Sequence, residues 1–422
     1  MAVNKLDNSM IDPNDIGTSA NQLVQIDGST KIPAVDGSLL TGIVGFTASA
    51  SDPTVSTNPS GGVGTIWKNT TSGEVYCCTD ATAGANVWKN VGAGTGDIEP
   101  QTVWNERGLT YGYATAGQGY PASPPHTDWE DIERFPFASD SNSTDTSGNM
   151  PDCVTHSSCH SSETHGYQSG SYPTGTNLIL KYSFASPGSG GSDIGNLVGG
   201  NNSGQYGACS ASDPETTAKG YIAGGYTPVA TYITDIVSVS FTSDGNAVDS
   251  GYDLAVDAYH TQGVGSPLKG YTFGGNTASG HHNDIQGYSY SSMSNATVVA
   301  DLIHGQSGLP GCNSSGTYGY KCGGTNATNS GYPPGVYGVD EIEKFNFSTE
   351  ADSVDIANLT RVVQHPGACS SMTHGYILGG YIGDSPSVYG DHISKFTFAS
   401  DNNATEVGSL IRGATLRGAH QV

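Results

Sequence analysis

The sequence is poor in charged residues, and above all in basic ones. Only 13% of its 422 residues are charged, and 39 acidic residues against 15 basic ones give a net charge of −24. A nucleic acid is a polyanion, so its phosphates would be repelled by this protein and no counterion release would favour binding. We therefore expect no nucleic-acid partner.

Long apolar runs are also missing. No segment approaches the roughly 18 consecutive apolar residues of a membrane-spanning helix, and the start, MAVNKLDNSMIDPNDIG, lacks the basic and apolar regions of a signal peptide. We therefore expect that the protein is made in the cytoplasm and does not insert into a membrane. The eight cysteines are irregularly spaced in a long chain, so most should be small buried residues rather than a disulfide framework.

Glycine and tyrosine, in contrast, are abundant and form a repeat. The chain has 60 Gly and 23 Tyr, and its aromatic and β-branched residues are spread between Gly-rich turns, a pattern that favours many short strands and an all-β fold. Six Gly-Tyr pairs follow one another at intervals of 54, 54, 50, 49 and 56 residues. They begin at Gly112, Gly166, Gly220, Gly270, Gly319 and Gly375. A period near fifty residues is the size of one propeller blade.

Each Gly-Tyr pair leads into further shared features. Four units close the apolar stretch after it with a glycine pair: Gly224-Gly225, Gly274-Gly275, Gly323-Gly324 and Gly379-Gly380. An alternating phrase such as IERFPF at 132 or IEKFNF at 342 follows, with the period of a strand buried on one face. With a third strand and a small-residue segment, each unit provides four short strands.

Such units cannot bury both faces of a sheet alone, so radial stacking into a six-bladed β-propeller is predicted. The C-terminal RGATLRGAHQV aligns with RVVQHPGACSS at 361–371, which predicts that residues 414–422 form an extra innermost strand completing the first blade. Over roughly residues 105–422 the chain resembles a divergent kelch repeat, although the Trp usual in the outermost kelch strand is absent.

The first hundred residues carry no such repeat. NQLVQIDGSTKIPAVDGSLLTGI, 21–43, resembles a segment near the virion-attached end of bacteriophage tail fibres, and GTIWKNTTSGEVYCCTDATAGANVWKNVG, 64–92, resembles the small β module that follows it. By its own residues that module should have a small core. We expect this core to contain Trp67, Val75, Tyr76, Val87 and Trp88.

The resemblance implies a virion protein made in the host cytoplasm. It further implies a homo-oligomer, usually a trimer, that joins other virion proteins through its N-terminal region. We predict an attachment and oligomerisation segment at 1–61, a small β module with a linker at 62–101, and the propeller at 102–422. The expected fold is thus all-β: a small N-terminal β-rich attachment region is followed in the chain by a six-bladed, kelch-like propeller.

No metal or cofactor site stands out in the sequence. CVTHSSCH, 153–160, has a density of Cys and His that would suit Zn²⁺, but on a strand its four candidate ligands do not share one face. The segment also aligns with the small-residue segments of other units, which hold Cys209, Cys312 and Cys369, and this favours a structural role. The Asx-rich turns offer oxygen ligands for Ca²⁺ without the spacing of a full binding loop, so Ca²⁺ stays an alternative to the expectation of no cofactor.

Enzymatic roles have no local motif either. A sialidase would need three converging arginines, a glycosidase two carboxylates about 5 to 10 Å apart, and a copper oxidase a convergent Tyr/His set. No residue is therefore predicted to be catalytic, and a polysaccharide-degrading tail enzyme is kept as the third alternative.

Binding is the stronger hypothesis. The gap between Gly-Tyr and the Ile of the alternating strand is longest in units five, six and one, which are consecutive in a closed ring. These Pro-rich loops carry aromatic side chains suited to sugar rings: Tyr120, Trp129, Tyr332, Tyr337, Tyr381 and Tyr389. We predict a non-enzymatic tail fibre that recognises a host-surface glycan. The main alternative for the whole protein is a capsid-mounted fibre or decoration protein with an adhesive or structural role. For the loops, the alternative to ligand binding is that they pack only on one another.

Overall fold

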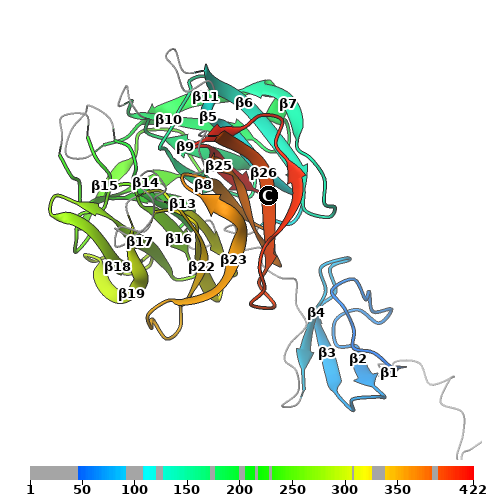
Figure 1. Cartoon of the computed structure of the whole chain (residues 1–422). Helices are drawn as coiled ribbons and strands as arrows, with labels where there is room; N and C mark the ends of the chain where they lie inside the picture. The colour runs from blue at the N-terminus through cyan, green and yellow to red at the C-terminus, as the bar shows by residue number, and fades with distance from the viewer. Residues whose placement is uncertain are drawn as a thin grey trace, which may run out of the picture. The chain divides into compact units, whose positions relative to one another are not determined.

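The computed structural model describes residues 46–91, 108–119, 127–171, 176–198, 205–213, 217–227, 231–306, 308–325, 338–382 and 388–422. The chain divides into two compact units, Met1–Thr102 and Val103–Val422, each of which is treated by itself below. Both are built from β-strands, and the described residues contain no α-helix, only the short 3₁₀ turn η4 (Pro187–Ser189) (Figure 1). The expectation of an all-β protein is confirmed.

The first unit contains one small four-stranded sheet. Its strands, in spatial order, are β1 (Phe46–Ser49), β2 (Ile66–Asn69), β3 (Val75–Asp80) and β4 (Val87–Asn90). The core is formed by Tyr76, Cys78 and Trp88, with Trp67 packed edge-on against Trp88 at a centroid distance of 5.8 Å. Two predicted core residues, Val75 and Val87, are only partly buried, because on these alternating strands Cys78 and Trp88 point inward instead. Strand β1 lies within the segment 1–61 that was assigned to attachment.

The second unit contains six antiparallel sheets, numbered here in chain order. Sheet 1 is formed by β5 (Tyr111–Gly119), β6 (Thr127–Pro136), β7 (Thr144–Asn149), β28 (Ala414–Thr415) and β29 (Gly418–Gln421). Sheet 2 is formed by β8 (Ser158–Ser161), β9 (His165–Ser169), β10 (Leu178–Ser183) and β11 (Gly191–Asn196). Sheet 3 is formed by β12 (Cys209–Asp213), β13 (Lys219–Ala223), β14 (Asp235–Ser240) and β15 (Val248–Asp253).

Sheets 4 to 6 follow the same order. Sheet 4 is formed by β16 (Gln262–Gly265), β17 (Lys269–Thr277), β18 (Gly280–Ser289) and β19 (Thr297–Gln306). Sheet 5 is formed by β20 (Gly311–Ser314), β21 (Tyr318–Cys322), β22 (Val339–Asn346) and β23 (Val354–Val363). Sheet 6 is formed by β24 (Gly367–Ser370), β25 (His374–Ile382), β26 (Val388–Thr397) and β27 (Thr405–Ser409). Each sheet thus runs from a first strand (β29, β8, β12, β16, β20 or β24) to a fourth, outer strand.

The glycine of each Gly-Tyr pair lies near the start of the second strand, opposite an aromatic or apolar residue of the third. A Cβ placed on Gly270 would lie 2.3 Å from Cζ of Tyr288, its cross-strand partner. A Cβ placed on Gly112 would likewise lie 2.4 Å from Cζ of Phe135, its cross-strand partner. At four of the six positions, Gly112, Gly166, Gly270 and Gly375, the missing side chain makes room for the aromatic ring of the cross-strand partner, whereas the space beside Gly220 is filled by His160.

The glycine pairs bend the far end of the second strand. Gly379 and Gly380 have φ of 59° and 102°, and the register with β26 shifts between Leu378 and Gly380. The degraded pair Ala116-Gly117 keeps this backbone, with φ of 51° and 121°. The bend is thus a property of the repeat, and glycine is the residue that adopts it at least cost.

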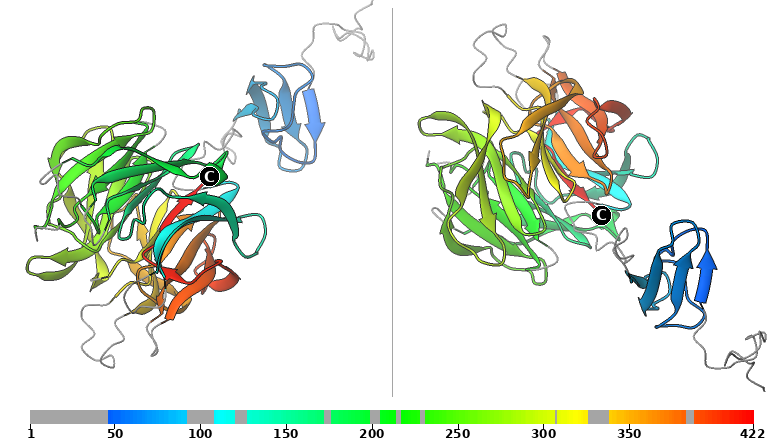
Figure 2. Two further views of the ribbon diagram at one scale, coloured as in Figure 1. Left: turned by 90° about the horizontal axis from the view of Figure 1, so that it is seen from above. Right: turned by 90° about the horizontal axis from the view of Figure 1, so that it is seen from below.

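The core lies between the sheets. Six buried hydrophobic clusters among the described residues are each shared by two neighbouring sheets, and one of them joins sheet 6 to sheet 1. The first strands also contact one another in succession, from β8 through β12, β16, β20 and β24 to β29, which in turn contacts β8. The two C-terminal strands pair antiparallel with β5, and Figure 2 shows the C-terminal strand beside it.

Candidate functional site

The aromatic residues predicted to bind a ligand belong to one end of the sheets, called the loop end here. It is the end at which the second and third strands of a sheet are connected, as between Gly119 and Thr127 or between Ile382 and Val388. Tyr120, Tyr332 and Tyr337 lie outside the described residues. Trp129, Tyr381 and Tyr389 are described and lie in the adjacent sheets 1 and 6.

Trp129 is held on β6 by contacts on both sides. Its ring packs over Gly119 of β5, where an added Cβ would lie 1.9 Å from Nε1 of the indole. The guanidinium carbon of Arg412 lies 4.1 Å from the centre of the ring, in cation–π geometry. Arg412 is half exposed, and its Nη1 lies 3.8 Å from a carboxylate oxygen of Asp131. Trp129 and Arg412 thus form a partly exposed surface in which a guanidinium lies over an indole ring.

Tyr381 and Tyr389 form a second aromatic surface in sheet 6. They are cross-strand partners on β25 and β26, with ring centroids 6.1 Å apart and planes at 59°. Burial, with a smaller contribution from Tyr381, raises the pKa of Tyr389. A Cβ on Gly413 would lie 2.2 Å from the carbonyl oxygen of Tyr389. Since Gly413 follows Arg412, one chain segment joins this pair to the Trp129 surface.

A buried ion pair supports the Trp129 surface. Glu133 on β6 and Arg417 have no exposed side-chain area, and their charged atoms are 2.7 Å apart. Ser143 donates to Glu133 at 2.6 Å, and the backbone N–H of Ile411 donates at 2.8 Å. Burial acts to raise the pKa of Glu133, but the charge of Arg417 and these hydrogen bonds outweigh it, so the pKa is lowered. Glu133 is therefore held ionised as an anchor.

The same arrangement recurs in sheet 5. Lys321 and Glu343 are both fully buried, with the ammonium 2.9 Å from the carboxylate. Ser353 donates to Glu343 at 2.6 Å and the backbone N–H of Ile303 at 2.9 Å, matching Ser143 and Ile411 around Glu133. A buried carboxylate repeated in two sheets with the same set of donors favours a structural role over that of a catalytic acid.

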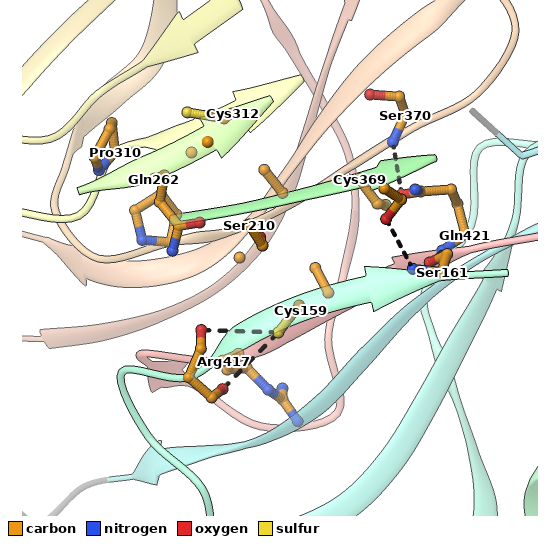
Figure 3. A pocket seen from close by; sticks show the side chains of 18 residues that line it. Cys159, Ser161, Ser210, Gln262, Pro310, Cys312, Cys369, Ser370, Arg417 and Gln421 are labelled. Carbon is orange, nitrogen blue, oxygen red and sulfur yellow. Dashed lines mark hydrogen bonds between the residues drawn. The ribbon is translucent and has the colours of Figure 1, made fainter. Parts of the chain in front are cut away.

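The first strands of all six sheets line a cavity of about 60 Å³ (Figure 3). Its lining consists of small residues (Ser, Cys, Gly, Ala and Pro) and of three larger polar ones, Gln262, Arg417 and Gln421. Hydrogen bonds join neighbouring first strands: the backbone N–H of Gln421 donates to Ser161 at 3.2 Å, and that of Ser370 to the side-chain oxygen of Gln421 at 3.4 Å. The cavity has room for a few water molecules and not for a sugar ring. A glycan site must therefore lie outside it.

Histidine rings from sheets far apart in the chain form a cluster that was not predicted from the sequence. His156 and His260 have ring centroids 5.1 Å apart, and the ring of His365 lies 6.1 Å from the first and 5.9 Å from the second. Each stands two residues before a first strand, at the loop end. The sequence contains a signal for this cluster, because the three histidines stand at the same repeat position, 104 and 105 residues apart.

In the Cys/His segment at 153–160, the Sγ of Cys153 lies 3.6 Å from the carbonyl oxygen of Gly117, in the neighbouring sheet. His160, one of its members, turns between sheets and bonds to the carbonyl oxygen of Tyr221 at 2.9 Å. In the side-chain positions of the described residues, no group of three or more His, Cys, Asp or Glu is placed to hold a metal ion. All eight cysteines are free, and Cys78, Cys209, Cys322 and Cys369 are buried.

Comparison with known proteins leaves the family open. No protein-family model matches the chain, and a search of curated proteins found no relative. In the part of the chain that is described, no helix is long and apolar enough to cross a membrane.

Proposed function

We propose that this chain is a non-enzymatic virion protein, a tail fibre that displays a six-bladed, kelch-like β-propeller and recognises a host-surface glycan. The succession of first-strand contacts that returns from β29 to β8 supports the propeller, as do the clusters between all neighbouring sheets. In this account the pairing of β29 with β5 closes the ring.

One observation carries the binding role. The Trp129–Arg412 surface and the Tyr381–Tyr389 pair lie on adjacent sheets, at the same end, joined through Gly413. Aromatic faces pack against the C–H groups of sugars, and a guanidinium donates to hydroxyl or carboxylate oxygens. The Trp129 ring packs over Gly119, and Tyr381 and Tyr389 are cross-strand partners on β25 and β26. Rings held on strands in this way lose little conformational entropy when a ligand binds.

The remaining parts of the proposal concern assembly. The first unit has its own core, as a separately folded module between the propeller and the particle requires. We infer that residues 1–61 attach the fibre to other virion proteins and that the chain forms a homo-oligomer, a trimer by its resemblance to tail fibres. A capsid-mounted decoration protein would have the same parts, and its position on the particle distinguishes the two.

A glycan array probed with the purified full-length chain tests the binding role. We expect the unmodified chain to bind a subset of bacterial surface glycans. Trp129→Ala and Tyr389→Ala should each weaken that binding by roughly 5- to 150-fold, the change that corresponds to the loss of an aromatic contact of about 1–3 kcal/mol. Tyr252→Ala, which removes an exposed tyrosine on β15 of sheet 3, is the matched control and should bind normally.

Two outcomes would count against this function. Equal binding by all variants would place the glycan elsewhere on the chain. Shortening of the glycan during incubation would identify a polysaccharide-degrading enzyme instead.

A further inference from the structure

The tyrosine pair of sheet 6 has a counterpart in sheet 3. Tyr226 directly follows the glycine pair of sheet 3, as Tyr381 follows that of sheet 6. Tyr226 forms a β-bridge with Tyr232, just as Tyr381 is the cross-strand partner of Tyr389. The ring centroids of Tyr226 and Tyr232 are 4.9 Å apart with planes at 78°, against 6.1 Å and 59° in sheet 6. The loop end thus carries a second pair of tyrosines built on the same backbone.

The backbone does not require tyrosine at this position. The residue after the glycine pair is Asn276 in sheet 4 and Thr325 in sheet 5, and Gln118 follows the degraded pair of sheet 1. Smaller, polar side chains therefore suffice here. Tyr226 and Tyr232 are only partly buried, so neither is a core residue. Aromatic rings left partly in water are enriched where proteins bind partners and ligands.

A row of neighbouring rings connects the two tyrosine pairs. The ring of Tyr226 lies 4.9 Å from that of Tyr259, which stacks on His260 at a centroid distance of 3.8 Å. His260 lies 5.9 Å from His365. The residue before His365 exchanges backbone hydrogen bonds of 2.9 and 2.7 Å with Tyr381. All of these rings are partly buried, none fully, so the row runs from sheet 3 to the proposed glycan site of sheets 6 and 1.

Two of the histidines at the loop end are uncharged at neutral pH. Burial lowers the pKa of His365 to about 4, and burial, with the two neighbouring histidines, lowers that of His156 well below its usual value. Neutral imidazole and phenol rings suit the C–H faces of uncharged sugar units, whereas an anionic unit would find no cation in these two rings. The charge available to a ligand lies at the other end of the row, on Arg412 beside Trp129.

We propose that the loop end binds an oligosaccharide segment of several sugar units, with the Tyr226–Tyr232 pair as a second contact beyond the site on sheets 6 and 1. This inference rests on the glycan recognition proposed above and extends it to the length of the ligand. Three further rings lie between Tyr226 and Tyr381 along the row, so a single sugar ring does not reach both pairs. Because the second contact forms within one complex, it raises the affinity for a polymer above that for its single units.

The test is the affinity of the full-length chain for fragments of increasing length, prepared by mild acid hydrolysis of the surface polysaccharide of a strain to which the chain adsorbs. Calorimetric titration measures each affinity, and the unfolding temperature of every variant is measured in parallel. Tyr232→Ala removes one ring of the second pair, and Tyr232→Phe keeps that ring. Tyr252→Ala is the matched control, because Tyr252 is an exposed tyrosine on the outer strand of the same sheet.

We expect the affinity of the unmodified chain to rise with fragment length. Tyr232→Ala should weaken binding of the longest fragments by roughly 5- to 150-fold and leave the shortest bound fragment unaffected, because that fragment occupies only the site of Trp129 and Tyr389. Tyr232→Phe and Tyr252→Ala should bind every fragment as the unmodified chain does.

Two results overturn this inference and leave glycan recognition standing. One is full-strength binding of the longest fragments by folded Tyr232→Ala, and the other is an affinity of the unmodified chain that does not rise with length. Absence of binding to fragments of every length would instead contradict the proposed function itself, and the inference would fail with it.

Discussion

At the residue scale, single polar side chains join neighbouring sheets in a repeated way. His160 and His420 each bond through Nε2 to the carbonyl oxygen of the tyrosine in the next Gly-Tyr pair, Tyr221 and Tyr167, at 2.9 Å. Since a carbonyl can only accept, Nε2 must carry the proton, and Nδ1 of both rings is buried with no hydrogen-bond partner among the residues that the structure describes. Asn313 takes the same position in sheet 5 and donates to the next sheet at Cys369.

These histidines make stability depend on pH. Burial lowers the pKa of His160 and of His420 to about 4, against an unfolded value near 6.5. Between those values the unfolded chain binds protons that the folded chain does not, so stability rises with pH from about 4 to about 6.5 and is lost on acidification. The contribution is a few kcal/mol at most for each ring.

His420→Asn tests this origin of acid sensitivity, because asparagine keeps the donor and removes the titration, as Asn313 does in sheet 5. We expect the variant to lose less stability than the unmodified chain between pH 6.5 and pH 4.5, measured by urea unfolding at each pH. At pH 7 the two should differ by only about 1 kcal/mol. An identical pH dependence in both proteins would show that other groups set the acid limit.

At the scale of strands, the sheets share the same backbone arrangement but differ in one cross-strand pair of side chains between the second and third strands. In sheet 5 this pair is the buried Lys321–Glu343 ion pair, and in sheet 3 the cross-strand pair at the same position is Ile222–Val237. A buried ion pair often adds little net stability over a well-packed apolar pair, whereas one charge left alone is costly.

The chain therefore supplies its own double-mutant comparison. Glu343→Val alone should destabilise the protein by about 3–5 kcal/mol, because Lys321 is left buried without its partner. Lys321→Ile together with Glu343→Val copies sheet 3 and should recover most of that loss. Chemical denaturation of both variants and the unmodified chain measures this. A double variant as unstable as the single one would mean that the ion pair itself holds sheet 5 together.

The repeat also explains what the sequence could predict. Gly-Tyr spacing and the alternating phrases indicated the strands correctly, because period-2 burial and glycines under aromatic rings are local features. The histidine cluster and the Glu133–Arg417 pair could not be found this way, because their partners are 104 or more residues apart and meet only when sheets are adjacent. Three of the six predicted glycan-binding residues, Tyr120, Tyr332 and Tyr337, lie outside the described residues.

At the scale of the whole molecule, the two ends of the second unit depend on each other. The last strand, β29, pairs with β5. The same C-terminal segment contains Arg417, which forms the ion pair with Glu133, and His420, which bonds to sheet 2. Removing residues 412–422 would leave β5 with an unpaired edge and Glu133 with a buried, uncompensated charge. We expect the chain truncated after Ile411 to lose cooperative unfolding, measured by calorimetry. A truncated chain with a sharp transition near the original temperature would contradict the role of closure.

The most direct test of the account is adsorption of the full-length protein to intact bacteria from a strain panel. The unmodified protein is compared with the Trp129→Ala/Tyr389→Ala double variant and the Tyr252→Ala control. We predict that the unmodified and control proteins adsorb to the same strains, that the double variant adsorbs to none, and that soluble glycan from a bound strain competes. Equal adsorption by the double variant, or adsorption that glycan does not compete, would contradict glycan recognition at the loop end.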